Sequence, residues 1–136
     1  MSAVAIMSAL ATALATVSPS LATAWENTPY TPVVGTAYQR VFLLMGEPVP
    51  LEQSGRVNRE QGVMQVSLCY PLSTGSGAAL TRAELIRATF YRGRTFTSGS
   101  TTLTIDRMPE ISPALIENDR YVIPVRIRFY SHVIRS

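Results

Sequence analysis

The residue types that usually carry out chemistry are scarce in this chain. His132 is the single histidine and Cys69 the single cysteine. A zinc site takes three or four protein ligands of this kind, so these two residues cannot build one. His132 paired with Asp106 or Asp119 could act as a base, but no nucleophile motif accompanies it. We therefore predict no catalytic residue and no metal site, with His132 at the surface or a sheet edge and Cys69 in or near the core.

Two further patterns resemble reactive sites but lack a component. Residues 73–77, with the sequence STGSG, lie between an expected strand and an expected helix, where backbone N–H groups could hold a phosphate. A nucleotide-binding loop of the P-loop type also needs a lysine, and the sequence contains none. Glu110 and Glu117 have no neighbours in the sequence that would raise a carboxyl pKa. We predict a flexible turn at residues 73–77, no enzyme activity and no cofactor.

Two amphipathic helices are expected to support these residues. In the first, Ser8, Thr12 and Thr16 recur every four residues opposite an apolar face, and the helix ends before Pro19. The second is predicted over Thr81–Arg92. Thr81 and Glu84 are expected to form a capping box at its start, and Gly93 is expected to end it. The residues expected to face the core are Leu85, Ile86, Thr89 and Phe90.

Alternation of apolar and polar residues predicts β-strands over Ala37–Met45, Gly62–Tyr70, Thr101–Asp106 and Tyr121–Val133. The first of them is apolar on both faces, which indicates a central strand covered on both sides. Residues 117–119 predict a turn. Pro124 cannot donate a ladder hydrogen bond, so the first half of the last strand is expected at a sheet edge or a bulge. Together with the helices, these strands predict an α+β fold over residues 1–136, a single domain in which two helices pack on a mostly antiparallel sheet.

Composition excludes several classes of protein. Hydrophobic residues at 46% and charged residues at 15% are typical of a folded domain that keeps some apolar surface for a partner. A net charge of +3 without a basic cluster does not indicate nucleic-acid binding. Met1–Ala24 ends like a signal peptide, but no lysine or arginine precedes Arg40, so we expect neither secretion nor a membrane anchor.

The most distinctive segments are Thr23–Pro32, with the sequence TAWENTPYTP, and Gly62–Val66, with the sequence GVMQV. Trp25 is expected to pin an extended segment to the core, and Pro29 and Pro32 to force a rigid loop after it. With the strand and the polar segment between them, these motifs resemble the tail-terminator proteins of long-tailed bacteriophages over roughly residues 3–130.

This resemblance implies a structural virion protein. Members of that family are small α+β domains that assemble as a ring, commonly a hexamer. The ring caps the tail tube, stops its polymerisation and provides the surface for head–tail joining. The partners implied are further copies of the chain, the tail tube protein, a head-completion or neck protein and the tape-measure protein. The implied location is the neck at the top of the virion tail, after assembly in the host cytoplasm.

A polar segment, Gly46–Gln61, is too long for a simple connection, so we expect a long polar arm or hairpin. It carries charges of both signs, as unlike faces in a ring require. The residues predicted to form a subunit interface are Glu52, Arg56, Arg59 and Glu60. A solvated hairpin without a partner is the alternative for this segment.

Two other protein classes stay open at this level. Another head–tail joining or minor tail protein would share the ring but not the capping role. A small secreted binding domain would require cleavage after the first 24 residues or so.

Overall fold

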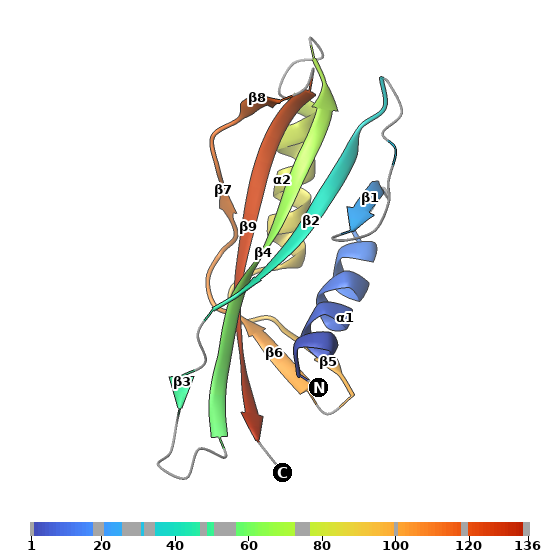
Figure 1. The fold of residues 1–136 in the computed structure, drawn as a ribbon. Coiled ribbons are helices and arrows are strands. Elements are labelled where there is room, and N and C mark those ends of the chain that lie inside the picture. The colour runs from blue at the N-terminus through green and yellow to red at the C-terminus, as the bar shows by residue number, and fades with distance from the viewer. Residues whose placement is uncertain are drawn as a thin grey trace.

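The computed structural model describes residues 2–17, 21–25, 31, 35–46, 49–50, 57–72, 77–99, 101–117 and 120–134. In chain order their elements are α1 (Ser2–Ala15), β1 (Ala22–Trp25), β2 (Tyr38–Met45), β3 (Val49–Pro50), β4 (Val57–Pro71), α2 (Gly77–Thr89), β5 (Thr95–Ser98), β6 (Thr101–Ile105), β7 (Glu110–Ile111), β8 (Leu115–Glu117) and β9 (Arg120–Ile134). Figure 1 shows a long, twisted sheet with both helices on one side. The predicted α+β class, with two helices on a mostly antiparallel sheet, is confirmed.

The described strands form one sheet in the order β1-β2-β4-β9-β6-β5, and β3, β7 and β8 add short pairings to β4 and β9. The two long strands at its centre, β4 and β9, pair antiparallel along their whole length. The pairing of β1 with β2 is parallel. Residues 26–37 connect these two strands, and they supply the dozen or so residues that a parallel pairing requires.

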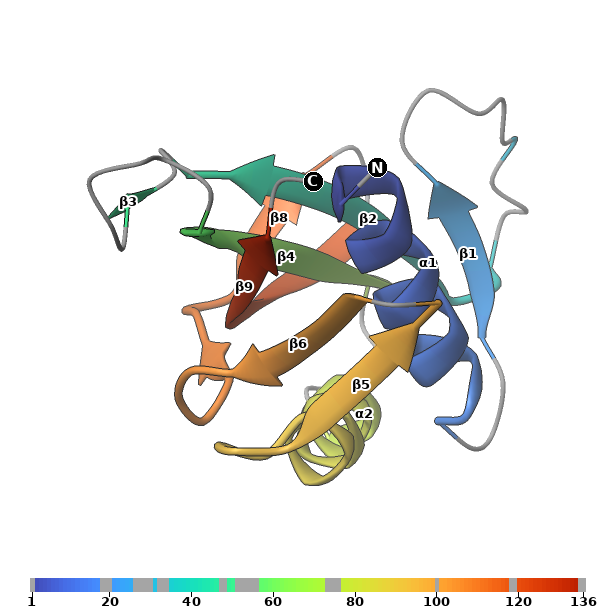
Figure 2. The same cartoon turned by 90° about the horizontal axis from the view of Figure 1, so that it is seen from below.

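The core lies between the helices and the sheet. Both helices cover the same face, and the sheet curls so that β5 and β6 lie against α1 (Figure 2). The largest fully buried side chains of this core are Ile6, Leu10, Leu14, Met64, Leu68, Ile86, Phe90, Leu103, Ile105, Ile127 and Phe129. They come from α1, α2 and the residue directly after it, β4, β6 and β9, so the core joins segments from nearly the whole chain.

Helix α1 agrees with its predicted amphipathic pattern. Ser8, Thr12 and Thr16 are exposed, whereas Leu10 and Leu14 are buried. The Thr16 hydroxyl donates a hydrogen bond to the Ala13 carbonyl at 2.6 Å, which satisfies one of the last carbonyls of the helix. Trp25 lies partly buried against the core from β1, as predicted, while the predicted loop prolines, Pro29 and Pro32, lie outside the described residues.

Helix α2 begins one turn earlier than predicted. It starts at Gly77, so Thr81 lies inside the helix and the predicted capping box is wrong. Glu84 instead pairs with Arg87 at 3.4 Å. The preceding Ala78-Ala79-Leu80 sequence consists of good helix formers, which extend the helix toward its N-terminus. The helix ends at Thr89, whose carbonyl accepts a hydrogen bond from Arg94, and Gly93 then turns the chain with φ +87°.

Two strand predictions need correction. The far half of β2 is not covered on both faces, because Phe42 and Leu44 point away from the helices and are exposed. Strand β9 is central rather than at an edge. The Pro124 carbonyl accepts a hydrogen bond from Ser112, so the nitrogen of Pro124 faces the same side, in the gap between β7 and β8. The missing N–H therefore interrupts no pairing with β4. Strand β5 was not predicted.

Part of the predicted arm belongs to the sheet. Residues 57–61 are the first residues of β4, and β3 pairs with them antiparallel. This portion is a ladder rather than an irregular loop. Residues 47–48 and 51–56 lie outside the described residues, so a long polar arm is not confirmed.

Candidate functional site: the outer face of the sheet

The side chains of β2, β4 and β9 that point away from the helices form a continuous surface, the outer face. Alternation along each strand defines it, because Val41, Met64 and Ile127 point into the core and their chain neighbours point outward. Paired positions give two rows across the three strands: Leu44, Val63 and Arg128, and then Phe42, Gln65 and Arg126. Each row therefore runs from an apolar residue on β2 to an arginine on β9.

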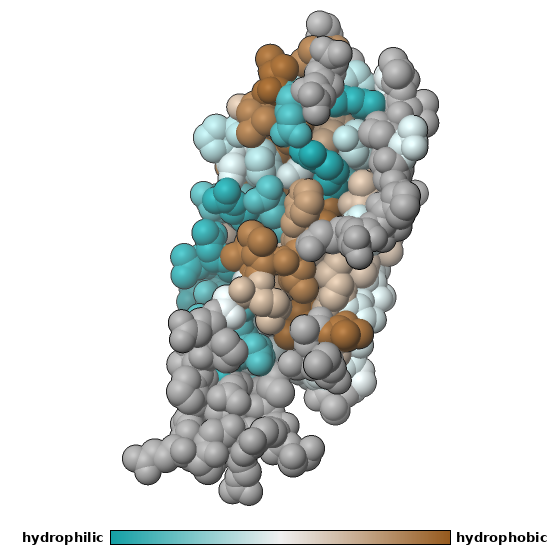
Figure 3. All heavy atoms as spheres, viewed as in Figure 1, coloured by the Kyte–Doolittle hydropathy of each residue, from teal (hydrophilic) through white to brown (hydrophobic). Residues whose placement is uncertain are grey.

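An apolar patch occupies the β2 side of the outer face. Phe42 is exposed, and Leu44 exposes 58% of its surface. Figure 3 shows hydrophobic side chains gathered in the middle of this face, with hydrophilic ones beside them. Leu44 lies opposite Val63 on β4, so the patch spans two strands. A contiguous apolar patch bordered by polar residues is typical of a protein–protein contact surface.

The arginines of the outer face are held in place by carboxylates from other elements. The pairs are Arg40 with Glu117 at 3.0 Å, Arg59 with Asp106 at 3.8 Å and Arg128 with Glu110 at 3.3 Å. All six side chains are partly exposed, so each pair contributes at most about 1 kcal/mol to stability. Their main effect is to fix the orientation of the guanidinium groups.

Arg40 and Arg126 differ in their surroundings. Burial opposes the charge of Arg40, but the hydrogen bond to Glu117 and the charge interactions with Glu117, Cys69 and Tyr38 together outweigh this effect and raise the pKa of the guanidinium. Arg126 is exposed and donates a hydrogen bond to the Gln65 side chain at 3.3 Å. The guanidinium of Arg40 therefore stays charged, whereas Arg126 lies in the row of Phe42 with Gln65 between them.

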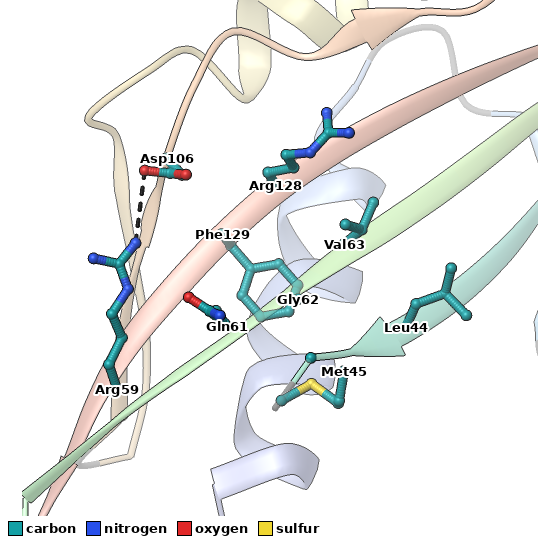
Figure 4. Close-up of a pocket in the computed structure, with 10 residues that line it drawn as sticks. Leu44, Met45, Arg59, Gln61, Gly62, Val63, Asp106, Arg128 and Phe129 are labelled. Atoms are coloured by element: carbon teal, nitrogen blue, oxygen red, sulfur yellow. Dashed lines mark ion pairs between the residues drawn. The ribbon is translucent and has the colours of Figure 1, made fainter. Parts of the chain in front are cut away.

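A hollow of about 350 Å³ lies at the far end of β2, beside the paired strands β4 and β9. Figure 4 shows the labelled side chains around it. Its apolar lining is Leu44, Met45, Gly46, Gly62, Val63 and Phe129, and its polar lining is Arg59, Gln61, Asp106 and Arg128. A cavity of about 150 Å³ already holds a benzene-sized molecule, so this hollow has room for aliphatic side chains of a partner.

The predicted interface residues are only partly brought together. Glu52 and Arg56 lie outside the described residues. Arg59 and Glu60 are neighbours on β4 and therefore point to opposite faces of the sheet. Arg59 lies at the rim of the hollow, and its guanidinium carbon is 4.2 Å from the centre of the Tyr130 ring.

The side chains that the sequence analysis weighed as reactive groups contact only other side chains and backbone groups of the fold. His132 is exposed on β9, with its ring centre 5.6 Å from that of Tyr130. Cys69 is buried, and its thiol donates to the Ser67 carbonyl at 3.6 Å. Glu110 and Glu117 pair with different arginines. Within the described ranges, no three His, Cys, Asp or Glu residues are grouped as metal ligands.

Sequence reasoning missed the outer face as a unit. The Arg–Glu pairs join residues far apart in the sequence, for example Arg40 and Glu117, so no local spacing reveals them. The apolar patch did have a signal, because Phe42-Leu43-Leu44-Met45 is an unbroken apolar run at a strand end. That run was interpreted as double coverage, although it is equally compatible with an exposed contact surface.

The described residues thus define an α+β protein whose outer face has three features that suit docking: an apolar patch, several arginines and a hollow. A solved structure with a TM-score of 0.76 and 20% sequence identity matches 98% of this chain and 95% of its own chain, which shows a shared fold. No curated protein sequence matches the chain.

A family model described as phage tail terminator protein matches residues 5–129. The chain therefore belongs to the phage tail terminator family, and its role is that of a structural component of the virion tail. This finding confirms the resemblance carried by the TAWENTPYTP and GVMQV segments. Among the helices that the structure describes, none is long and apolar enough to cross a membrane.

Proposed function

We propose that this protein is the ring-forming terminator of a phage tail. Residues 1–136 act as one tail-terminator domain, and copies of it assemble as a ring, a hexamer by the family resemblance. The ring caps the tail tube, stops its polymerisation and presents the opposite surface for head–tail joining, in the neck of the virion. The supporting observation is the family match over residues 5–129, which includes most of every described helix and strand.

The size of the chain supports a closed assembly. A single domain of 136 residues is too small to cover the end of a tube built from many subunits. Identical subunits cover such an end by closing around an axis, and each one then needs two unlike contact surfaces. The outer face supplies one surface of suitable character. We also propose that four residues of the predicted arm contribute to the contact between subunits: Glu52, Arg56, Arg59 and Glu60.

The remaining partners follow from the capping role. One side of the ring contacts the tail tube protein, with the tape-measure protein inside the tube as a further partner. The other side contacts a head-completion or neck protein. The role is geometric. One side of the ring copies the docking surface of the tube, and the other side offers no site for a further tube subunit.

The test is deletion of the gene in the phage, followed by electron microscopy of the particles. We expect tails longer than normal and tails without heads, and we expect rings in preparations of the purified protein. Tails of normal length joined to heads would overturn the proposal. Tails of normal length without heads would assign the protein to head–tail joining rather than to length control.

A further inference from the structure

A second cavity, the inner cavity, lies on the helix side of the sheet. It has a volume of about 140 Å³, close to the cavity of about 150 Å³ that holds a benzene molecule. Strand β1 and the C-terminal end of α1, which lie next to each other in Figure 1, form most of its wall. The wall is mainly apolar, and β2 and α2 contribute one polar side chain each: Gln39 and Arg82.

The orientation of the Gln39 amide follows from its hydrogen bonds. Gln39 Nε2 donates to Thr23 Oγ1 at 3.0 Å, and the Thr23 hydroxyl donates to the Leu21 carbonyl, also at 3.0 Å. A hydroxyl has a single proton, so Thr23 Oγ1 can only accept from Gln39. The amide nitrogen of Gln39 must therefore face Thr23, and the amide oxygen must point elsewhere.

The oxygen of this amide is a buried acceptor. Gln39 is 2% exposed, and no donor from the described residues reaches its Oε1. Since Gln39 lines the inner cavity, a group bound there is in position to supply the donor. A buried acceptor without a donor costs free energy, so a ligand that donates to Oε1 recovers that cost on binding.

Arg82 restricts the charge of such a ligand. It is 4% exposed, and burial lowers the pKa of its guanidinium, so the surroundings already disfavour positive charge. An ammonium group would add a second cation to the same small cavity. A carboxylate has acceptors only and would bring an oxygen against the Gln39 oxygen. These two restrictions leave an uncharged group that carries an N–H or O–H donor.

We propose that the inner cavity binds an uncharged carboxamide on a short aliphatic body. The amide N–H donates to Gln39 Oε1, and the amide carbonyl lies toward the Arg82 guanidinium. The aliphatic part packs against Leu14, Val17 and Leu21, which line the cavity. A free small amide has this chemistry, and so does the asparagine or glutamine side chain of a partner protein. The inference does not depend on the proposed function.

Three probes of similar size test the charge selectivity: isobutyramide, isobutyrate and isobutylammonium. Trp25 is the only tryptophan of the chain and lines the cavity, so its fluorescence reports occupancy. We expect a saturable change with isobutyramide and binding of both ions that is weaker by about tenfold or more. Equal or tighter binding of isobutyrate would overturn the inference, because Arg82 rather than Gln39 would then select the ligand.

Two variants test the role of the Gln39 oxygen. Gln39→Met keeps the length of the side chain and removes Oε1, so isobutyramide should bind about tenfold more weakly. Gln65→Met on the outer face is the matched control and should bind like the unmodified protein, since Gln65 does not line the cavity. Unchanged binding in Gln39→Met would contradict the proposal.

A crystal structure grown with isobutyramide gives a readout that does not rely on variants. We expect the amide nitrogen of the probe within hydrogen-bond distance of Gln39 Oε1. Water alone at this oxygen, at a saturating concentration of the probe, would overturn the inference.

Phages that carry Gln39→Met distinguish the two sources of the amide. Defective tails would assign the amide to a side chain of a tail partner, whereas normal particles would assign it to a free small molecule. Both results agree with the site, provided that Gln39→Met lowers isobutyramide binding. Tail termination is tested separately by the gene deletion, so a failed amide site leaves that proposal intact.

Discussion

Gly62 on β4 lies directly opposite Phe129 on β9, and a Cβ atom at position 62 would lie 3.0 Å from Cζ of the Phe129 ring. The same Cβ would lie 2.6 Å from the Leu44 carbonyl oxygen on β2. Three strands therefore approach one another closely at a position where the chain has no side chain. This close approach also shapes the hollow, which Gly62, Leu44 and Phe129 all line.

Gly62→Ala is expected to destabilise the protein by about 1–3 kcal/mol, because the backbone of β2 and the buried Phe129 ring must both shift. Chemical unfolding of the variant measures this difference. Gly77→Ala is the control, since nothing lies within 4 Å of a Cβ there and alanine favours the helix. If both variants unfolded at the same denaturant concentration, the close approach at Gly62 would carry no energetic weight.

Leu10→Ala in α1 is expected to cost about 2–5 kcal/mol, because it leaves a cavity in the core between the helix and the sheet. Thr12→Ala on the exposed face of the same helix should change stability by less than about 0.5 kcal/mol. Removal of residues 1–18 should abolish the cooperative thermal transition or cause aggregation. A truncated protein that still melts cooperatively would show that α1 is dispensable for the fold.

Replacing Arg56 and Arg59 by Glu is expected to weaken ring assembly, since positions 52, 56, 59 and 60 would then all be acidic. Because Arg59 pairs with Asp106, the double variant also disturbs the subunit itself. Adding Asp106→Arg restores opposite charges at positions 59 and 106 without restoring the charge of the arm. A persistent defect in ring counts by electron microscopy supports the arm, whereas recovery assigns the defect to the lost ion pair.

Stability is expected to fall at alkaline pH. Burial raises the pKa of Tyr70, and burial together with the nearby Cys69 raises the pKa of Tyr38. Both tyrosines ionise more easily in the unfolded chain, so their contribution is complete below about pH 10 and is lost as pH rises through the folded values. Urea midpoints measured from about pH 9 upward should decline less in Tyr70→Phe than in the unmodified protein. Parallel curves would contradict the assignment.

Nucleotides, Mg²⁺ and chelators are expected to leave the melting temperature unchanged. The chain has no lysine for a P-loop, and its single cysteine is buried away from the exposed His132. A ligand that binds only the folded state raises its stability in proportion to the logarithm of concentration. Thermal scans with increasing ligand therefore check the prediction directly, and a reproducible rise with any of them would refute it.

Periodicity in the sequence was sufficient for most of the fold. The buried faces of α1, β4, β6 and β9 follow directly from helical or alternating patterns, because a single dominant core selects one face of each element. Periodicity was insufficient where a capping signal competes with helix propensity. Thr81 and Glu84 have the spacing of a capping box, but the alanine-rich residues before them extend the helix and remove that role.

The family, the fold class and the buried faces of the elements follow from the amino-acid sequence, because they depend on local patterns and short motifs such as TAWENTPYTP and GVMQV. The composition of the outer face, by contrast, depends on how the strands pair in the folded protein. Arg40 forms an ion pair with Glu117, and Leu44 and Arg128 lie in one row because each pairs with Val63, so distant segments meet there. Register across a sheet is fixed by the packing of all its strands together, so no local spacing could have placed the apolar patch, the arginines and the hollow on one surface.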